Sequence, residues 1–322
     1  MNRILQKLFW YESRWVLLGC SFGVLAFCWF RVWIVGNFDT SEFRQIMDLL
    51  PKDWRKFASV DFDWLVSYLG RTSLTLDEPM LLLFVLAWPL IRGSDVVSGH
   101  ISRGTMEMML AQPISRSRWY WNHVCYTIGG GLILTLTCWV GMTMGIFTTS
   151  VEESTYPEIK IPLVDYAIPL TFLEPTTETV AMVSEVNPIQ FLPGVVNLFF
   201  LAFVMAGFSY CVSAFDRYRW RTLGVIFIFY VISGLLKLLG MASERFVWAT
   251  QFTVMGYYEP ASSIELSQRV DGAGFWFSKV DEAGEMTGLG PIGNYLVLFS
   301  LGLLLFLIGW RRFVDRDVSA PL

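Results

Sequence analysis

Residues 291–310 read PIGNYLVLFSLGLLLFLIGW, a run without Asp, Glu, Lys or Arg. A helix needs about 20 apolar residues to cross the hydrocarbon core of a bilayer, so this run has the length and composition of a membrane span. Other stretches of the chain share this character. The predicted transmembrane helices are six in number and cover residues 15–36, 74–91, 119–148, 189–215, 222–241 and 291–310.

The composition also favours a membrane protein. Hydrophobic residues make up 54% of the 322 residues and charged residues only 16%, with a mean hydropathy of +0.49. This is more apolar than a soluble surface can easily accommodate. We therefore expect an all-α integral membrane protein in which residues 1–322 form a single transmembrane domain.

Charged residues make the second predicted span the least regular. Asp77 and Glu78 lie inside it, and Pro89 is expected to kink it near its cytoplasmic end. In other spans, Arg31 and Lys237 each lie a few residues from an outer helix end, where long side chains can reach the lipid head groups.

The basic residues predict the orientation. Segments 1–14, 92–118, 216–221 and 311–322 hold 13 Lys and Arg in 59 residues, whereas segments 37–73, 149–188 and 244–290 hold only 9 in 124. Lys and Arg concentrate in the cytoplasmic loops of membrane proteins. The prediction is a multi-pass protein of the cell (inner, cytoplasmic) membrane with both termini in the cytoplasm.

The segments outside the spans have distinct expected roles. In residues 1–14, Ile4, Leu5, Leu8 and Phe9 share one helical face, which predicts a helix lying in the inner interface and leading into the first span at an angle. Segments 37–73, 149–188 and 244–290 are expected to be extracytoplasmic loops.

Residues 93–118 connect the second and third predicted spans, and we call them the coupling segment. Thr105 is placed to cap a short helix, Glu107 to favour the helix dipole, and Pro113 to mark the helix end. An apolar face follows at i, i+3, i+4 spacing, formed by Met106, Met109 and Leu110. Such a helix can press on a partner and transmit its movement, or it can be a plain connection lying on the membrane.

Residues 104–116 read GTMEMMLAQPISR. This run resembles the signature of ABC-2-type permeases, the membrane-spanning subunits of a class of ATP-driven ABC transporters, in which GTLE, LL and PISR follow the second span. The carboxyl end agrees, since WRRFVDRD at residues 310–317 is similar to the tail that often closes these permeases. One departure is His100, because the family frequently has an acid four residues before the Gly-Thr pair.

The resemblance implies a fold, partners and a site. The fold would be ABC-2 exporter-like, with a cytoplasmic coupling helix that docks on an ATP-binding ABC ATPase subunit, and the function would be that of a permease, with export favoured. Further partners would be a second permease copy or a paralogue, and membrane lipid, but no nucleic acid. The implied ATPase-coupling residues are Arg103, Gly104, Thr105, Met106, Glu107, Met109, Leu110, Pro113, Ser115 and Arg116.

The chain lacks the motifs of several other functions. It has no phosphate loop of the Gly-x-x-x-x-Gly-Lys-Ser/Thr type, so ATP hydrolysis is expected on another polypeptide and this chain is not expected to be an enzyme. Its only histidines, His100 and His123, lie at no ligand spacing from a cysteine, so no metal or cofactor is expected.

Two other functions remain open at this point. A membrane-embedded enzyme would need catalytic groups in the spans, where only Asp77 and Glu78 are placed near an outer end. A non-transporting scaffold or sensor with the same fold is the other alternative.

Small residues four apart allow close helix approach at two places, Gly19 with Gly23 and Gly141 with Gly145. Each pair can serve either a dimer contact or packing within the chain.

Overall fold

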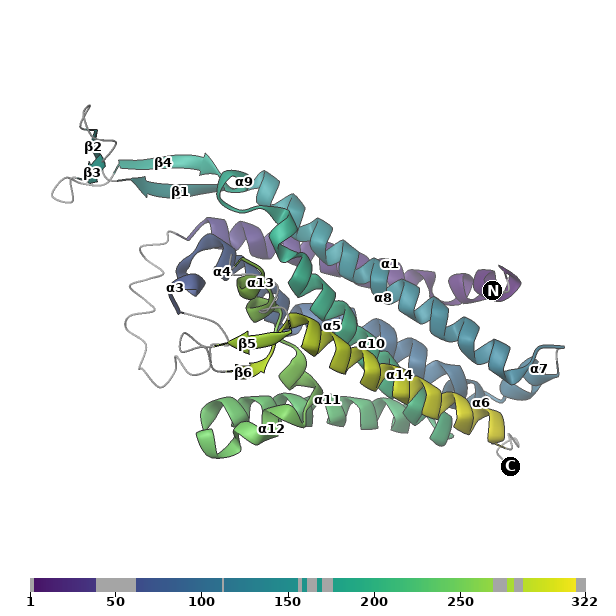
Figure 1. The fold of residues 1–322 in the computed structure, drawn as a ribbon. Coiled ribbons are helices and arrows are strands. Elements are labelled where there is room, and N and C mark those ends of the chain that lie inside the picture. Colours follow the sequence, from purple (N-terminus) through teal and green to yellow (C-terminus); the bar gives the residue numbers. More distant parts are fainter. Residues whose placement is uncertain are drawn as a thin grey trace.

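The structure is a computed structural model, and it describes residues 3–38, 62–111, 113–155, 158–160, 167–169, 176–268, 277–280 and 286–316. Within these ranges, six helices are long and apolar enough to cross a membrane. They are α1 (Arg3–Gly36), α5 (Pro79–Ser94), α8 (Arg116–Thr148), α10 (Leu192–Phe215), α11 (Arg219–Ala242) and α14 (Pro291–Asp315). They form one elongated bundle (Figure 1), the architecture of a multi-pass membrane protein.

The amino-terminal end of the bundle differs from the expected separate helix. One helix runs from Arg3 to Gly36, so residues 3–14 are continuous in helix with the first span. Phe9 is fully buried, with its ring centroid 5.4 Å from that of Trp119 and 3.8 Å from that of His123. At this position, the apolar face that the spacing predicts contacts α8.

The second span begins later and ends later than its apolar run predicts. Pro79 occupies the first turn of α5, where its missing N–H leaves no helical bond unmade, and Leu74–Asp77 form the separate 3₁₀ turn η2. Asp77 and Glu78 therefore precede α5. At the other end, the helix continues as η3 (Asp95–Gly99) and α6 (His100–Ser102), so the candidate span reaches Ser102.

The two cations expected near outer helix ends have protein partners. Arg31 Nε lies 3.1 Å from Glu78 Oε1, and Lys237 Nζ donates to the Tyr258 carbonyl at 2.7 Å. Both side chains thus join spans to the segments at the bundle end opposite the termini.

Glycines let two helix pairs approach closely. A Cβ at Gly207 of α10 would lie 2.5 Å from the carbonyl oxygen of Gly302 in α14. In the pair α1 and α8, a Cβ at Gly141 would lie 2.9 Å from the Leu25 carbonyl oxygen, and one at Gly145 would lie 2.6 Å from Val32. The Gly141 and Gly145 pair therefore serves packing within the chain.

The other small pair behaves differently. A Cβ at Gly23 would lie 2.8 Å from the Phe84 side chain, so this position also serves packing within the chain, whereas Gly19 has no neighbour within 4 Å.

The segments expected as outer loops contain folded elements. Along the chain these are α3 (Phe62–Val66), α4 (Tyr68–Ser73), β1 (Ser150–Thr155), β2 (Glu158–Lys160), β3 (Ala167–Pro169), β4 (Thr176–Ala181), α9 (Met182–Glu185), η4 (Pro188–Phe191), η5 (Glu244–Phe246), α12 (Val247–Gln251), η6 (Val254–Tyr257), α13 (Pro260–Gln268), β5 (Ser278–Val280) and β6 (Met286–Leu289). The strands pair antiparallel as β1 with β4, β2 with β3 and β5 with β6. An all-α description therefore holds for the spans and needs these short ribbons added outside them.

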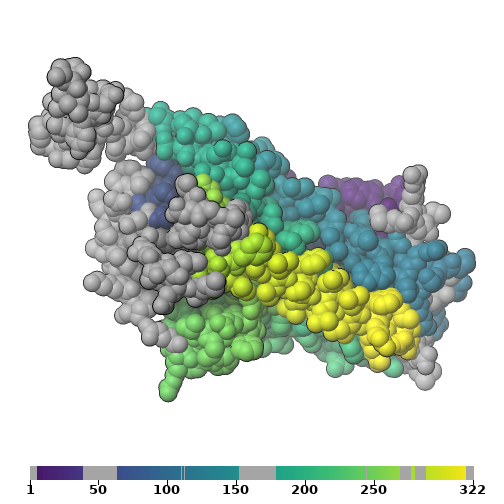
Figure 2. All heavy atoms as spheres, viewed as in Figure 1, coloured from purple at the N-terminus to yellow at the C-terminus, as the bar shows by residue number. Residues whose placement is uncertain are grey.

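Both chain ends and α7 (Met106–Leu110) lie at the same end of the bundle (Figure 1), as an even number of spans requires. The strand ribbons, α3 and α13 lie towards the opposite end. Figure 2 shows α14, in yellow, running along one face of the molecule towards the end that carries the termini. The assignment of this end to the cytoplasm rests on its basic residues.

Candidate coupling site

The coupling segment begins as an irregular extension of α5. Asp95–Gly99 form a π-helical turn, η3, before one further α-helical turn, α6. Single π-turns of this kind often mark functional positions in helices. A Cβ at Gly99 would lie 2.3 Å from Asp95 Oδ1, so glycine gives the carboxylate the space it occupies.

Gly104 reverses the chain between α6 and α7. Its φ is +69°, and no other described residue has a positive φ. The Thr105 N–H donates to the His100 carbonyl at 3.0 Å and the Gly104 N–H to the Ile101 carbonyl at 3.0 Å, which is the Schellman pattern that ends a helix at a left-handed glycine. The Gly of the Gly-Thr pair is thus required by the turn itself.

Thr105 does not cap α7 in the way the sequence suggests. It precedes the first helical residue, but its side chain makes no capping hydrogen bond. Its hydroxyl lies 3.0 Å from His100 Nδ1 and also donates to the His100 carbonyl at 3.2 Å. The side chain therefore fastens the turn to α6.

The apolar face predicted on α7 points into the bundle. Met106 is 2% exposed and Met109 packs against the same core cluster, which also contains Trp119 and Phe9. The exposed side chains of α7 are Glu107 and Met108, and Met108 is 72% exposed. A partner would meet Met108 together with the exposed residues Arg103 and Gly104 of the turn. The side chain of Leu110 lies outside the described residues.

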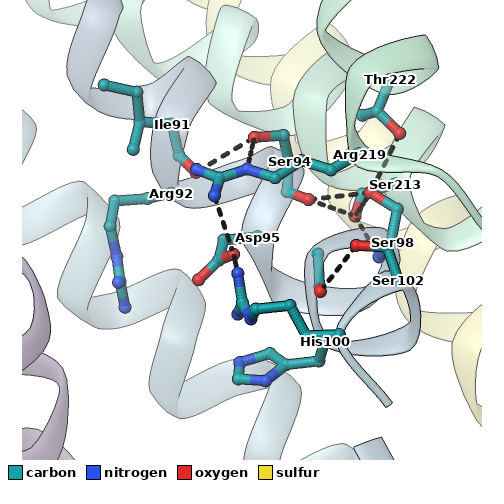
Figure 3. A network of polar contacts seen from close by, with 12 residues as sticks. Ile91, Arg92, Ser94, Asp95, Ser98, His100, Ser102, Ser213, Arg219 and Thr222 are labelled. Atoms are coloured by element: carbon teal, nitrogen blue, oxygen red, sulfur yellow. Dashed lines mark hydrogen bonds and ion pairs between the residues drawn. The ribbon is translucent and has the colours of Figure 1, made fainter. Parts of the chain in front are cut away.

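A polar network joins the coupling segment to two other spans, and we call it the Asp95 network (Figure 3). Its members are Ser94, Asp95, Ser98, Arg103, Ser213, Arg219 and Thr222, with Ser94 joining Arg219 to Ser98. Asp95 Oδ1 lies 2.7 Å from Arg103 Nη1 and 3.5 Å from Arg219 Nη1. One carboxylate therefore bridges the turn and α11.

Hydroxyl groups complete the Asp95 network. Ser213 Oγ of α10 accepts the N–H groups of Val97 at 3.3 Å and of Ser98 at 3.0 Å, which the π-turn leaves available. Thr222 Oγ1 of α11 donates to Ser98 Oγ at 3.0 Å. These buried donors and acceptors form hydrogen bonds with one another, and the bonds fix the end of the second span to α10 and α11.

Electrostatics hold the turn in place. The hydrogen bond to the Asp95 carboxylate raises the pKa of the Arg103 guanidinium above its ordinary value, and the charge of Asp95 adds to this effect. A guanidinium is charged at any physiological pH, and Arg103 pairs with the Asp95 carboxylate at 2.7 Å. Its side chain is 43% exposed, so it is anchored and still reachable from outside.

The start of α8 and the carboxyl-terminal motif contact each other. Ser115 accepts the Arg118 N–H at 3.3 Å and caps α8. Arg116 Nη1 donates to the carbonyls of Val314 at 3.2 Å and Arg316 at 2.5 Å. The two motifs that carry the family resemblance therefore meet in space, although about 200 residues separate them.

Arg316 in turn joins α14 to α10. Its Nη1 donates to the carbonyls of Ala214 at 2.8 Å and Asp216 at 2.9 Å, where α10 ends. A cation at a helix carboxyl end satisfies carbonyls that have no helical partner. The tail motif thus fastens three helix ends together.

The Arg316→Ala variant is expected to lose about 1–2 kcal/mol of stability, because two charge-assisted hydrogen bonds to α10 disappear. The measurement is unfolding in mixed detergent micelles followed by tryptophan fluorescence. Arg311→Ala is the matched control, because the Arg311 side chain is 83% exposed. Equal losses in both variants would contradict the role given to Arg316.

Both histidines lie in the aromatic core, His123 against Phe9 and His100 against Trp119. His123 Nδ1 lies 3.3 Å from Arg92 Nη2, and the His100 and His123 ring centroids are 6.2 Å apart. Among the described residues, no group of three or more His, Cys, Asp or Glu is arranged to hold a metal ion. Pro113 is exposed and follows α7, which ends at Leu110.

At the opposite end of the bundle, Asp77 lies close to Lys237, Glu259 and Glu78. Burial raises the pKa of Asp77 to about 6, with Lys237 opposing and Glu259 and Glu78 adding to the rise. In the same region, the Tyr258 hydroxyl donates a hydrogen bond to the Leu76 carbonyl at 2.5 Å.

The raised pKa of Asp77 predicts a pH effect on stability. An unfolded Asp has a pKa of about 3.9, so the folded protein binds more protons between about pH 4 and 6, and stability falls as pH rises through that window. The melting temperature of the native protein minus that of Asp77→Asn should therefore be lower at pH 7.5 than at pH 4.5. Asp315→Asn, at a side chain 64% exposed, is the control; a pH-independent difference for Asp77→Asn would rule the effect out.

Comparison with known proteins gives no relative: no family model, no curated protein and no solved structure matches this chain. The membrane architecture therefore rests on the six helices, and the ABC-2 resemblance rests on the residues of the two motifs.

Proposed function

We propose that this chain is the membrane-spanning permease subunit of an ATP-driven ABC transporter, acting as an exporter together with a second copy or a paralogue. The energy would come from a separate cytoplasmic ABC ATPase subunit that binds the coupling segment. The observation that carries the proposal is the outward position of Arg103 and Gly104 in the turn and of Met108 on α7, on a segment whose other contacts hold it to the spans.

The contacts that hold the coupling segment to the bundle make it suitable for transmitting force. Met106 anchors α7 in the core, Asp95 ties the turn to α11, and Arg116 ties the next helix to the carboxyl-terminal tail. A movement of the exposed turn is therefore passed to several helix ends at once. The ATPase would do work on the bundle only through different affinities for its two conformations.

A change at Met108 tests the docking role without disturbing the fold. We expect Met108→Asp to abolish co-purification of the ATPase from gentle detergent, because a charge replaces an exposed apolar contact. Met108→Leu is the matched control and should keep the partner, since it preserves an apolar side chain of similar volume. The readout is a bound polypeptide that carries a phosphate loop and hydrolyses ATP.

Met109 is a poor choice for this test, because it packs against the core and a charge there would disturb folding. If intact protein brings down no such ATPase, the transporter proposal fails and the scaffold or enzyme alternatives take its place. If Met108→Asp binds the ATPase as well as Met108→Leu does, the docking surface is elsewhere.

A further inference from the structure

A basic cavity opens at the end of the bundle that carries the termini, where α10, α11 and α14 meet. Its volume is about 680 Å³. We call it the basic cavity, and its lining residues are Val212, Phe215, Asp216, Arg217, Tyr218, Arg221, Arg312, Asp315 and Arg316. Four arginines and two aspartates leave a formal charge of +4 − 2 = +2.

The acids of the cavity pair with only one of its four arginines among the described residues. Asp216 Oδ1 accepts the N–H groups of Arg217 at 2.6 Å and Tyr218 at 3.2 Å, and its Oδ2 lies 3.8 Å from Arg221 Nε. Asp315 lies 4.0 Å from Arg311, which is outside the lining. Among the described residues, neither carboxylate forms an ion pair with Arg217, Arg312 or Arg316.

Those three arginines have no carboxylate partner among the described residues. Arg316 donates to backbone carbonyls, and Arg312 lies over the Phe215 ring with its Cζ 5.4 Å from the centroid. The backbone N–H of Arg217 donates to Asp216 Oδ1. Burial lowers the pKa of Arg316, the positive charges of Arg217 and Arg312 lower it further, and the negative charge of Asp216 opposes them only in part. The cavity is therefore short of negative charge.

The cavity also has the right place and walls for a lipid. It lies at the ends of three spans, at the depth where phospholipid head groups meet water if these helices cross the bilayer. Phe215 and Tyr218 are exposed beside the arginines, at 56% and 47%. Basic pockets between span ends suit anionic head groups, and arginine binds phosphate oxygens through its planar fork of donors.

From this arrangement we infer that the basic cavity is a phosphate-binding site, which takes the phosphodiester head group of an anionic phospholipid through Arg217 and Arg312. This site is independent of ATPase docking, because it lies on the α10, α11 and α14 ends and not on α7. Free phosphate presents the same chemistry, so the test must separate the two sources.

The test is native mass spectrometry of the purified full chain in detergent, titrated with phosphatidylglycerol or with phosphatidylcholine of the same acyl chains. The native protein should bind one phosphatidylglycerol in preference to phosphatidylcholine. Arg217→Gln with Arg312→Gln should weaken this binding about 25-fold, since each arginine near an anionic head group contributes about fivefold. Arg311→Gln removes the same charge from the neighbouring residue outside the cavity and should leave the affinity unchanged.

Added inorganic phosphate distinguishes the sources. Displacement of the lipid by millimolar phosphate would mean that the site accepts the free anion, and no displacement would mean that it requires the lipid. Equal binding of the two phospholipids, or an equal loss in Arg311→Gln and in the double variant, would overturn the inference. Should the double variant fail to fold, Arg217→Gln alone is the substitute, with about a fivefold loss expected.

Discussion

Gly207→Leu is expected to prevent the native packing of α10 on α14. A Cβ at this position lies 2.5 Å from the carbonyl oxygen of Gly302, and 3.2 Å from its carbonyl carbon and its Cα. These are backbone atoms of a second span, so neither side can yield without separating the helices. Overpacking of this kind costs about 3 kcal/mol or more, which is a large part of the stability of a typical domain.

The measurement is the yield of monodisperse protein in detergent and its unfolding free energy in mixed micelles. Gly234→Leu is the matched control in α11, because a Cβ there meets nothing within 4 Å. That control should retain native stability. A Gly207→Leu variant as stable as Gly234→Leu would mean that α10 and α14 are not in the close contact described.

Asp95→Asn is expected to lower the free energy of unfolding by about 2–3 kcal/mol. The change leaves Arg103 and Arg219 without their carboxylate, and loss of one partner from a buried pair typically costs about 3–5 kcal/mol. The expected value is smaller here, because the Arg103 and Arg219 side chains are 43% and 34% exposed. The same change should release the turn, which limited proteolysis after Arg103 would detect.

A double-mutant cycle isolates the link between the turn and α11. Arg219→Gln combined with Asp95→Asn should cost less than the sum of the two single changes, because the pair contact at 3.5 Å is lost in either variant. Arg221→Gln, at a side chain 57% exposed, serves as the control and should be additive with Asp95→Asn. Strict additivity for Arg219 as well would show that the two residues do not interact.

The spans could be predicted from hydropathy because the bilayer sets their length and composition independently of tertiary contacts. Their ends could not, and the reasons are local. Pro79 begins α5 and leaves Asp77 and Glu78 outside it, and the π-turn at Asp95–Gly99 extends the same span into a polar sequence that hydropathy excludes. Prediction therefore works for the span interiors and is weaker at their boundaries.

The candidate site could be predicted in position but not in geometry. The run at residues 104–116 identifies the segment, but the positive φ of Gly104 that ends α6 is known only from the structure. Nothing local shows that Met106 faces inward, or that Thr105 bonds His100 instead of capping α7. Asp95 stands in a segment that also holds Arg92 and Arg103, but its partner Arg219 lies on a distant helix that only the fold brings near.

Residues 216–218 form the whole connection between α10 and α11. Arg219, directly after them, reaches the Asp95 network, and Arg217, within them, lines the basic cavity. Two arginines two positions apart in the chain therefore serve different places, one the Asp95 network and the other the basic cavity. Because only three residues join the two helices, a change in the conformation of this connection would move both arginines at once.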